Sequence, residues 1–263
     1  MKRRGRSSRH PSHELVAVVT GAAGGLGSAL CAALRDDGYR VIGADLAGAD
    51  RELDVRDPDA CRVLATEVRP DLWVNNAGIL AAGSALTQLD AEIRRCVEVN
   101  LLGVIHGSRA ATDVMVERGS GHILNIASLA SWVAVPGETV YAATKHAVRA
   151  FSVGLAAELR GTGVRVKILC PDGIWTPMLH DRLSDPAAAM SFTGTRLLSA
   201  DEVAAAAMDL LGSRKVLASV PPNRGLQTRL LGIAPGFSLK AGPLFEQVGK
   251  RNQRKLRKRP PPT

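Results

Sequence analysis

Residues 15–27 read LVAVVTGAAGGLG. The apolar, β-branched run from Leu15 to Thr20 predicts a buried parallel strand, and Leu30, Ala33 and Leu34 after the glycines recur with helical spacing. Glycines let the backbone turn tightly and approach a diphosphate, which would face the free N–H groups and the dipole of the following helix. The segment therefore predicts a dinucleotide-binding turn. An ordinary glycine-rich loop between a strand and a helix is the alternative.

A second apolar run, residues 40–44, ends at Asp45, eighteen residues after Gly27. A carboxylate at this place can accept hydrogen bonds from the hydroxyls of an adenosine ribose, and it would repel a 2′-phosphate. No Arg or Lys stands in the glycine turn or directly after Asp45 to bind such a phosphate. We therefore expect NAD to be preferred over NADP. The alternative is that Asp45 merely begins a surface loop.

Tyr141 and Lys145 are four residues apart, which places them on one face of a helix. A nearby cation lowers the pKa of a phenol, which is about 10 in a free tyrosine, and so makes it useful for proton transfer. Ser128, thirteen residues before Tyr141, could hydrogen-bond the substrate oxygen that exchanges the proton. The three residues together predict acid–base chemistry at a hydroxyl or carbonyl group.

These motifs resemble those of the short-chain dehydrogenase/reductase family, and the resemblance extends from about residue 14 to residue 220. Residues 20–27 are similar to the family's TGxxxGxG turn, residues 75–78 to its NNAG motif and residues 171–176 to its PGxxxT segment. The motifs follow the family's order along the chain. The resemblance implies hydride transfer between a nicotinamide cofactor and a CH–OH group.

The resemblance also implies roles for individual residues. Ser128, Tyr141 and Lys145 match the catalytic residues of the family, and Lys145 would also hold the nicotinamide ribose. Asn100 matches the asparagine that supports a water-linked proton relay to Lys145. The residues that match cofactor contacts are Gly21, Gly24, Gly25, Leu26, Gly27, Asp45, Asp54, Val55, Asn76, Ala77, Gly78, Tyr141, Lys145, Pro171, Ile174 and Thr176.

Asp172 departs from the family pattern, which has glycine after the proline that ends the strand. Asp tolerates a positive φ better than most side chains, although less well than Gly, so cofactor binding could survive the substitution. Alternatively, the carboxylate of Asp172 faces the nicotinamide or the substrate and tunes specificity.

Strand and helix patterns alternate along the 263 residues, and 46% of the residues are hydrophobic. We expect an α/β fold with a single Rossmann-like, doubly wound parallel sheet and helices on both faces. Strands are expected near residues 15–20, 40–45, 71–74, 122–126, 164–169 and 216–219, and helices near 25–37, 57–68, 87–118, 139–162 and 200–212. The expected organisation is a basic flexible tail at 1–13, a catalytic domain at 14–220 with a substrate lid at about 175–199, and a C-terminal extension with a basic tail at 221–263.

The formal net charge of +9 is concentrated at the two ends of the chain. Residues 1–14 carry a net charge of +4 and residues 240–263 carry +7, which leaves −2 for the rest. Solvated ends are the commoner meaning of such runs, and contact with anionic lipid is the alternative. Aromatic residues for base stacking are absent from both ends except Phe237 and Phe245, which argues against nucleic acid as a partner.

Residues 226–247 mix apolar side chains with glycine and proline, and we expect Pro235 and Pro243 to interrupt any long helix there. The stretch is too broken and charged to span a bilayer, but it could lie on a membrane surface, cover the substrate or meet another subunit. The N-terminal apolar run is too short for a signal peptide. We therefore expect a cytoplasmic protein, with peripheral membrane contact as an alternative. The expected assembly is a homodimer or a homotetramer.

The four cysteines, Cys31, Cys61, Cys96 and Cys170, have spacings that do not suit a zinc site and are expected to be small core residues in a reducing compartment. The expected chemistry needs no metal. The expected lid contains the apolar residues Met178, Leu179, Leu183, Met190, Phe192 and Leu197, and we expect Leu80, Leu129, Trp132 and Val133 to add an apolar wall near Ser128. Such a pocket predicts a hydrophobic alcohol or ketone substrate, such as a steroid-like, terpenoid or fatty-acyl compound. The alternative is that most of these residues pack the lid against the rest of the protein. The alternatives are a non-catalytic nicotinamide-sensing scaffold and a membrane-surface enzyme acting on lipids.

Overall fold

The computed structural model describes residues 14–258, so the expected N-terminal tail at 1–13 lies outside the described residues. Within this range, seven parallel strands form one sheet in the order β3-β2-β1-β4-β5-β6-β7. The strands are β1 (Val16–Thr20), β2 (Arg40–Asp45), β3 (Arg51–Glu52), β4 (Leu72–Asn75), β5 (Gly121–Ile126), β6 (Val164–Pro171) and β7 (Leu217–Val220). The order reverses between β1 and β4, which is where such sheets bind ligands.

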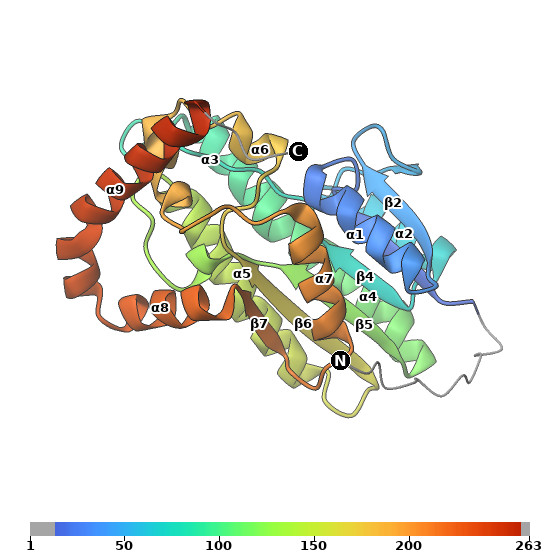
Figure 1. Cartoon of the computed structure of the whole chain (residues 1–263). Helices are drawn as coiled ribbons and strands as arrows, with labels where there is room; N and C mark the ends of the chain where they lie inside the picture. Colours follow the sequence, from blue (N-terminus) through green and yellow to red (C-terminus); the bar gives the residue numbers. More distant parts are fainter. Residues whose placement is uncertain (1–13, 259–263) are drawn as a thin grey trace.

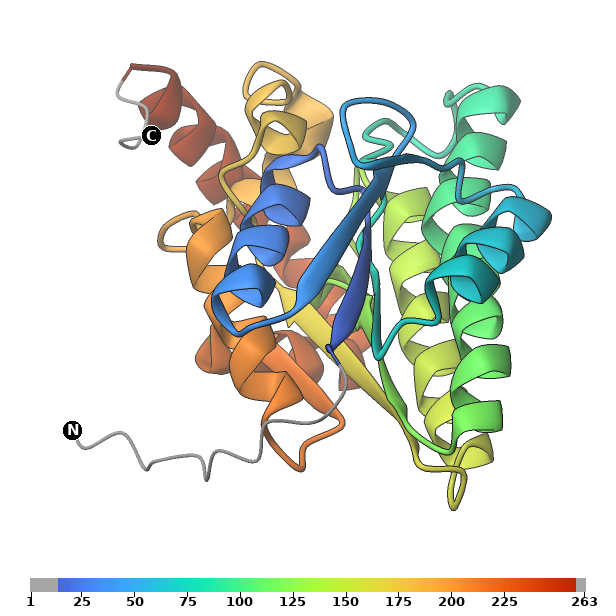
Figure 2. The ribbon, with the colours of Figure 1, turned by 90° about the vertical axis from the view of Figure 1, so that its right-hand side faces the viewer.

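Helices cover both faces of the sheet. Figures 1 and 2 show α1 (Gly25–Asp36) and α7 (Ala200–Leu211) on one face, and α2 (Pro58–Val68), α4 (Gly103–Arg118) and α5 (Thr139–Glu158) on the other. This arrangement confirms the expected doubly wound fold. The short strand β3 was not expected from the sequence, and it extends the sheet beyond β2 by pairing with Ala44 and Asp45.

The central strands are buried because helices pack on both of their faces. All five residues of β1 and all four of β4 are buried, and Trp73 in β4 is fully enclosed. Continuous apolar runs of this kind are typical of parallel strands with two covered faces. The core therefore fixes the position of the strand ends, from which the loops of the candidate site extend.

The helical stretch expected at 87–118 contains an irregular turn. It consists of α3 (Asp90–Val97), the π-helical turn η1 (Glu98–Leu102) and α4, which follow one another without a break. Asn100 lies within the π turn and is fully buried. Such turns are frequent at functional sites because they reorient a side chain without ending the helix.

The C-terminal extension forms two helices, α8 (Pro222–Ile233) and α9 (Pro235–Lys258). Pro235 separates them as expected, but Pro243 lies inside α9, so the expectation that it interrupts a helix is wrong. Proline removes one helical hydrogen bond and crowds the preceding turn, but tertiary packing of the rest of a helix can override this preference. In α9 that packing is made against the lid.

Residues 175–199, which the sequence predicts to be a substrate lid and which are called the lid below, contain α6 (Pro177–His180) and the 3₁₀ segment η3 (Pro186–Phe192). Asn252 in α9 donates to the carbonyls of Phe192 and Gly194, and Gln253 donates to those of Arg182 and Asp185. The basic residues Arg251, Arg254, Lys255, Arg257 and Lys258 are exposed, as expected of a solvated basic end. Two polar side chains of the same segment, Asn252 and Gln253, nevertheless attach it to the lid.

No helix within residues 14–258 is long and apolar enough to cross a membrane.

Candidate active site

A cavity of about 910 Å³ lies at the carboxyl ends of the strands. Its walls come from the glycine turn after β1, the ends of β2, β4, β5 and β6, the start of α5, the lid, and both C-terminal helices. All the predicted cofactor residues line this cavity, and so do Ser128, Tyr141 and Lys145. Asn100 is the one predicted site residue that does not.

The glycine turn after β1 has a conformation that only glycine fits. Gly21 has a φ of 67°, and a Cβ on it would lie 2.7 Å from the Cα of Ala77. A Cβ on Gly27 would meet the backbone of Gly21, so the start of α1 lies directly against the turn. Because the N-terminus of α1 has no side-chain cap and no acidic residue in its first turn, its N–H groups suit an anionic ligand.

Asp45 is held at the end of β2 by two backbone groups. Its carboxylate accepts hydrogen bonds from the N–H of Ala23 at 3.0 Å and of Leu46 at 2.8 Å. The contact with Ala23 joins the acid to the glycine turn. A carboxylate fixed in this way can still accept hydrogen bonds from ligand hydroxyls at the same mouth of the cavity.

Arg56 is a cavity residue that the sequence analysis missed. It forms a short hydrogen bond of 2.6 Å to Asp54 together with two longer ones, and this guanidinium lowers the pKa of the Asp54 carboxyl. The Asp54 carboxylate is thus already paired with the Arg56 guanidinium of the protein itself. Val55, the other predicted adenine-side residue, is buried, and its carbonyl contacts the His106 ring at 3.1 Å.

The NNAG segment is bonded to the end of β1. Asn76 donates through its side chain to the carbonyls of Thr20 and Gly21, and the N–H groups of Asn76 and Ala77 both donate to the hydroxyl of Thr20. These four hydrogen bonds join the ends of β1 and β4 at the point where the strand order reverses. The NNAG segment therefore fixes the backbone at the start of the glycine turn.

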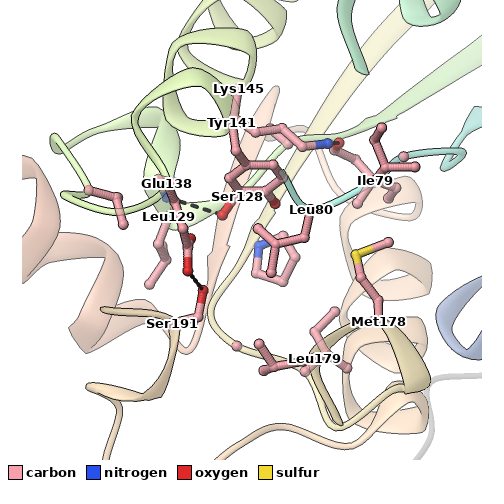
Figure 3. A pocket seen from close by; sticks show the side chains of 18 of the residues that line it. Ile79, Leu80, Ser128, Leu129, Glu138, Tyr141, Lys145, Met178, Leu179 and Ser191 are labelled. Carbon is pink, nitrogen blue, oxygen red and sulfur yellow. Dashed lines mark hydrogen bonds between the residues drawn. The ribbon is translucent and has the colours of Figure 1, made fainter. Parts of the chain in front are cut away.

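Ser128, Tyr141 and Lys145 gather at one end of the cavity (Figure 3). Ser128 follows β5 and caps a short 3₁₀ turn by accepting from the N–H of Ala130 at 3.1 Å. Tyr141 and Lys145 come from the first turns of α5, and the Lys145 Nζ lies 5.7 Å from the centre of the Tyr141 ring. Lys145 also donates to the carbonyl of Ile126 at 3.0 Å.

The electrostatics of this group differ from the expectation that Lys145 lowers the pKa of Tyr141. Burial is the largest influence and raises the pKa of Tyr141, Glu138 adds to the rise, and a hydrogen bond with Ser128 acts against it. Burial also lowers the pKa of Lys145 to about 8. Desolvation is therefore the largest influence on the pKa of both groups.

Asn100 fixes the backbone beside this group. Its side-chain carbonyl accepts from the N–H of Ile79 at 2.8 Å, and its amide donates to the carbonyl of Ile79 at the same distance. The paired bonds hold the segment that follows the NNAG motif. The proton relay implied by the family resemblance stays a prediction for Asn100.

The Pro171–Thr176 segment leads from the end of β6 into the lid and lies against the glycine turn. A Cβ on Gly25 would lie 2.9 Å from the Cγ2 of Thr176, so this segment packs directly on the turn. Ile174 forms an isolated parallel bridge with Leu198 at the end of the lid. Asp172 pairs with Arg224 of α8 at 2.8 Å, a partner that the sequence analysis did not identify.

The apolar walls of the cavity agree in part with the expectation. Leu80, Leu129 and Val133 line it, but Trp132 does not, because its ring lies between two arginine side chains. Three of the expected lid residues, Met178, Leu179 and Met190, reach the cavity, whereas Leu183, Phe192 and Leu197 do not line it. The helices α8 and α9 add Thr228, Leu231, Leu239 and Phe245, which agrees with the alternative that residues 226–247 cover the substrate.

Glu138 is an acidic residue in this wall that the sequence analysis missed. Its side chain is 1% exposed and accepts a hydrogen bond of 2.6 Å from Ser191 in the lid (Figure 3). Burial raises the pKa of Glu138 to about 7. A lone Glu before the YxxxK motif carries no pattern that would have indicated this position.

No group of His, Cys, Asp and Glu side chains among residues 14–258 is arranged to hold a metal ion. The four cysteines are buried and free, as expected of core residues.

Comparison with known proteins identifies the family. The model of the short chain dehydrogenase family matches residues 15–187. A 1-deoxy-11-beta-hydroxypentalenate dehydrogenase from Streptomyces avermitilis is 35% identical over 239 residues, which cover 81% of this chain and 86% of that protein.

Solved structures show the same fold. A short-chain dehydrogenase/reductase from Burkholderia phymatum in complex with NAD superimposes with a TM-score of 0.75 at 25% identity, covering 86% of this chain and 95% of that one. A short-chain dehydrogenase from Burkholderia cenocepacia in complex with NADP gives a TM-score of 0.74 at 26% identity, covering 88% of this chain and 97% of that one.

The chain belongs to the short-chain dehydrogenase family. It is an NAD(P)-dependent oxidoreductase that acts on CH–OH groups.

Proposed function

We propose that this protein transfers a hydride between NAD(H) and a hydrophobic secondary alcohol or ketone. The observation that carries the proposal is that one cavity is lined by both groups of residues. Asp45 and the glycine turn follow β2 and β1, whereas Ser128 follows β5, on the other side of β4 in the sheet. A dinucleotide whose diphosphate meets the N-terminus of α1 would then extend in one direction to Asp45 and in the other to Tyr141.

NAD is proposed as the preferred cofactor because the Asp45 carboxylate accepts hydrogen bonds from hydroxyls and repels phosphate. Among the cationic residues that line the cavity, Arg56 is the nearest to Asp45 in the sequence. Its guanidinium is already hydrogen-bonded to Asp54 at 2.6 Å. The residues present thus suit an adenosine ribose that carries free hydroxyls.

The protein's own residues would carry the proton in this reaction. The bound nicotinamide accepts or supplies the hydride. Ser128 would orient the substrate oxygen, and Tyr141 would take its proton during oxidation or return it during reduction. Lys145 would contact the nicotinamide ribose, and its ammonium would favour the phenolate of Tyr141 against the desolvation that raises the pKa of this phenol.

The substrate is proposed to be apolar because most of the wall around Ser128 and Tyr141 is apolar. The side chains that form this wall are Leu80, Leu129, Val133, Leu179 and Met190. A steroid-like, terpenoid or fatty-acyl compound with a secondary hydroxyl group has matching chemistry. The Streptomyces relative is named for a hydroxylated pentalenate, which is consistent with this class.

The test is a panel of hydrophobic secondary alcohols mixed with NAD⁺ and the purified protein, followed by the absorbance of NADH. Reduction of NAD⁺ by at least one alcohol supports the proposal. Binding of NAD without turnover of any alcohol or ketone would favour the non-catalytic scaffold instead.

One surface feature favours contact with a membrane as a second proposal. Leu226, Leu230 and Ile233 lie at spacings of four and three residues on α8, and all are exposed. The neighbouring α9 carries seven Lys or Arg residues and one Glu. An apolar helix face beside a basic helix suits the surface of an anionic bilayer, whereas two copies paired through α9 would repel each other.

A further inference from the structure

Arg224 joins three separate segments around the cavity. Its Nε donates to Asp172 at 2.8 Å, its Nη2 donates to Thr193 in the lid at 3.1 Å, and its Nη1 donates to Gln227 within α8 at 2.8 Å. A guanidinium has donors in a fixed planar fork, so one side chain can hold partners in several directions.

The pair of Arg224 and Asp172 is largely removed from water. Their side chains are 15% and 14% exposed, and both residues line the cavity. The lid packs closely against this pair at Gly194, where a Cβ atom would lie 3.2 Å from the Asp172 carboxylate. Removing one charge from such a pair leaves the other buried without a partner, which is more disruptive than removing both.

The segment held by this pair continues directly into the cofactor side of the cavity. The backbone N–H of Asp172 donates to the carbonyl of Val220 at 2.8 Å, and Leu198 donates to the carbonyl of Gly173 at 2.9 Å. Thr176, four residues after Asp172, packs on Gly25 of the glycine turn. The position of residues 172–176 therefore depends on β7, the lid and α8 together.

We propose that Arg224 is a positioning residue that, through Asp172, holds residues 172–176 against the nicotinamide end of the bound cofactor. This inference rests on the proposed function, because it places the nicotinamide between Tyr141 and this segment. It also gives Asp172 a role: the carboxylate is the anchor by which the C-terminal extension holds the cofactor segment.

The test compares the affinities for NAD⁺ and for ADP-ribose, which lacks the nicotinamide, by calorimetry. Arg224→Gln and Asp172→Asn should each weaken NAD⁺ binding roughly tenfold while ADP-ribose binding stays unchanged. Turnover of a confirmed substrate should fall by roughly 10–100-fold, since misplacement of a reacting group is costly. The double variant should lose less than the product of the two single losses.

Arg229→Gln is the matched control, because Arg229 lies on the same helix and contacts Trp132 and Ser219 instead of Asp172. It should leave the ratio of the two affinities unchanged. If Arg224→Gln does not fold, Arg224→Lys is the second variant, because it keeps the positive charge but lacks the planar set of guanidinium donors. It should still lower the affinity for NAD⁺ relative to that for ADP-ribose.

A variant that melts at a lower temperature but keeps both affinities and turnover would overturn the inference and leave Arg224 with a merely structural role. An equal loss of affinity for NAD⁺ and ADP-ribose would overturn it as well. If the wild-type protein binds no NAD⁺ at all, the proposed function fails and the inference fails with it.

Discussion

The hydroxyl of Ser191, in the lid, donates a hydrogen bond of 2.6 Å to the carboxyl of Glu138, one helical turn before Tyr141. This contact joins the lid to the start of α5 beside the reacting group. It also places an ionisable group in a wall that is otherwise mostly apolar.

Glu138 should make the protein less stable as the pH rises. Its pKa is raised from 4.5 to about 7 by burial, with Asp185 adding to the rise, while Ser191 and Arg182 lower it. The folded protein therefore retains a proton that the unfolded chain loses, and stability falls between pH 4.5 and about 7. The difference corresponds to at most about 3 kcal/mol.

Urea unfolding across this pH range measures the effect. Glu138→Gln should remove this part of the decline, and Ser191→Ala should retain it because the buried carboxyl remains. Parallel pH profiles for the wild-type protein and Glu138→Gln would show that Glu138 does not titrate in this range.

Tyr141→Phe should keep NAD binding and lose turnover by roughly 10²–10⁴-fold, the usual contribution of a general acid or base. The ring still fills its space, but the group that exchanges the proton is gone. Steady-state rates on a confirmed substrate and calorimetry with NAD measure the two effects. Tyr39→Phe, which changes the chain's other tyrosine, is the control. Near-normal turnover of Tyr141→Phe would refute the proton-transfer role.

Asp45→Ala should narrow the difference in affinity between NAD and NADP, mainly by weakening the binding of NAD. A lost hydrogen bond to a charged group costs roughly 1.5–3 kcal/mol, or about 10–100-fold in affinity. Asp209→Ala, an exposed change on α7 with the same effect on net charge, should alter neither affinity. Equal dissociation constants of the wild-type protein for NAD and NADP would contradict the proposed preference.

Deletion of residues 250–263 should lower the melting temperature and raise the KM for an apolar substrate, because it removes Asn252 and Gln253 from the lid. NAD affinity should change much less than KM, since the glycine turn, Asp45 and the Arg224–Asp172 pair keep their own contacts. Deletion of 259–263 alone is the control and keeps both contacts. Unchanged stability and KM in the longer deletion would show that α9 does not hold the lid.

Leu230→Ser combined with Ile233→Ser should reduce sedimentation with vesicles that contain anionic lipid, since both side chains are exposed on one face of α8. Leu86→Ser is the control, because Leu86 is 94% exposed but lies outside the two C-terminal helices. Failure of the wild-type protein to bind such vesicles at low salt would rule out the membrane proposal.

The sheet and the cofactor side of the cavity could be predicted because their signals are local. Val16–Thr20 needs only its own composition to indicate a buried strand, and the glycines directly after it indicate the turn. Asp45 could be placed because it ends the next strand. Each of these inferences uses residues that are neighbours in the sequence and in the fold.

The errors concern properties that depend on distant parts of the chain. The pKa of Tyr141 follows from burial, which a spacing of four residues to Lys145 does not report. Glu138 and Ser191 are 53 residues apart, and Asp172 and Arg224 are 52 apart, so no local motif connects either pair. Pro243 remains within a helix because the following turns of α9 are attached to the lid.

The attachment of the lid by Asn252 and Gln253 has a consequence for synthesis on the ribosome. The glycine turn, Asp45 and Tyr141 all emerge well before α9, so a nascent chain can form the cofactor half of the cavity while the lid still lacks its anchor. The substrate half is completed last, when the final turns of α9 leave the exit tunnel. A chain released early by a stop codon within α9 would therefore keep its nucleotide-binding half and lack a closed substrate half.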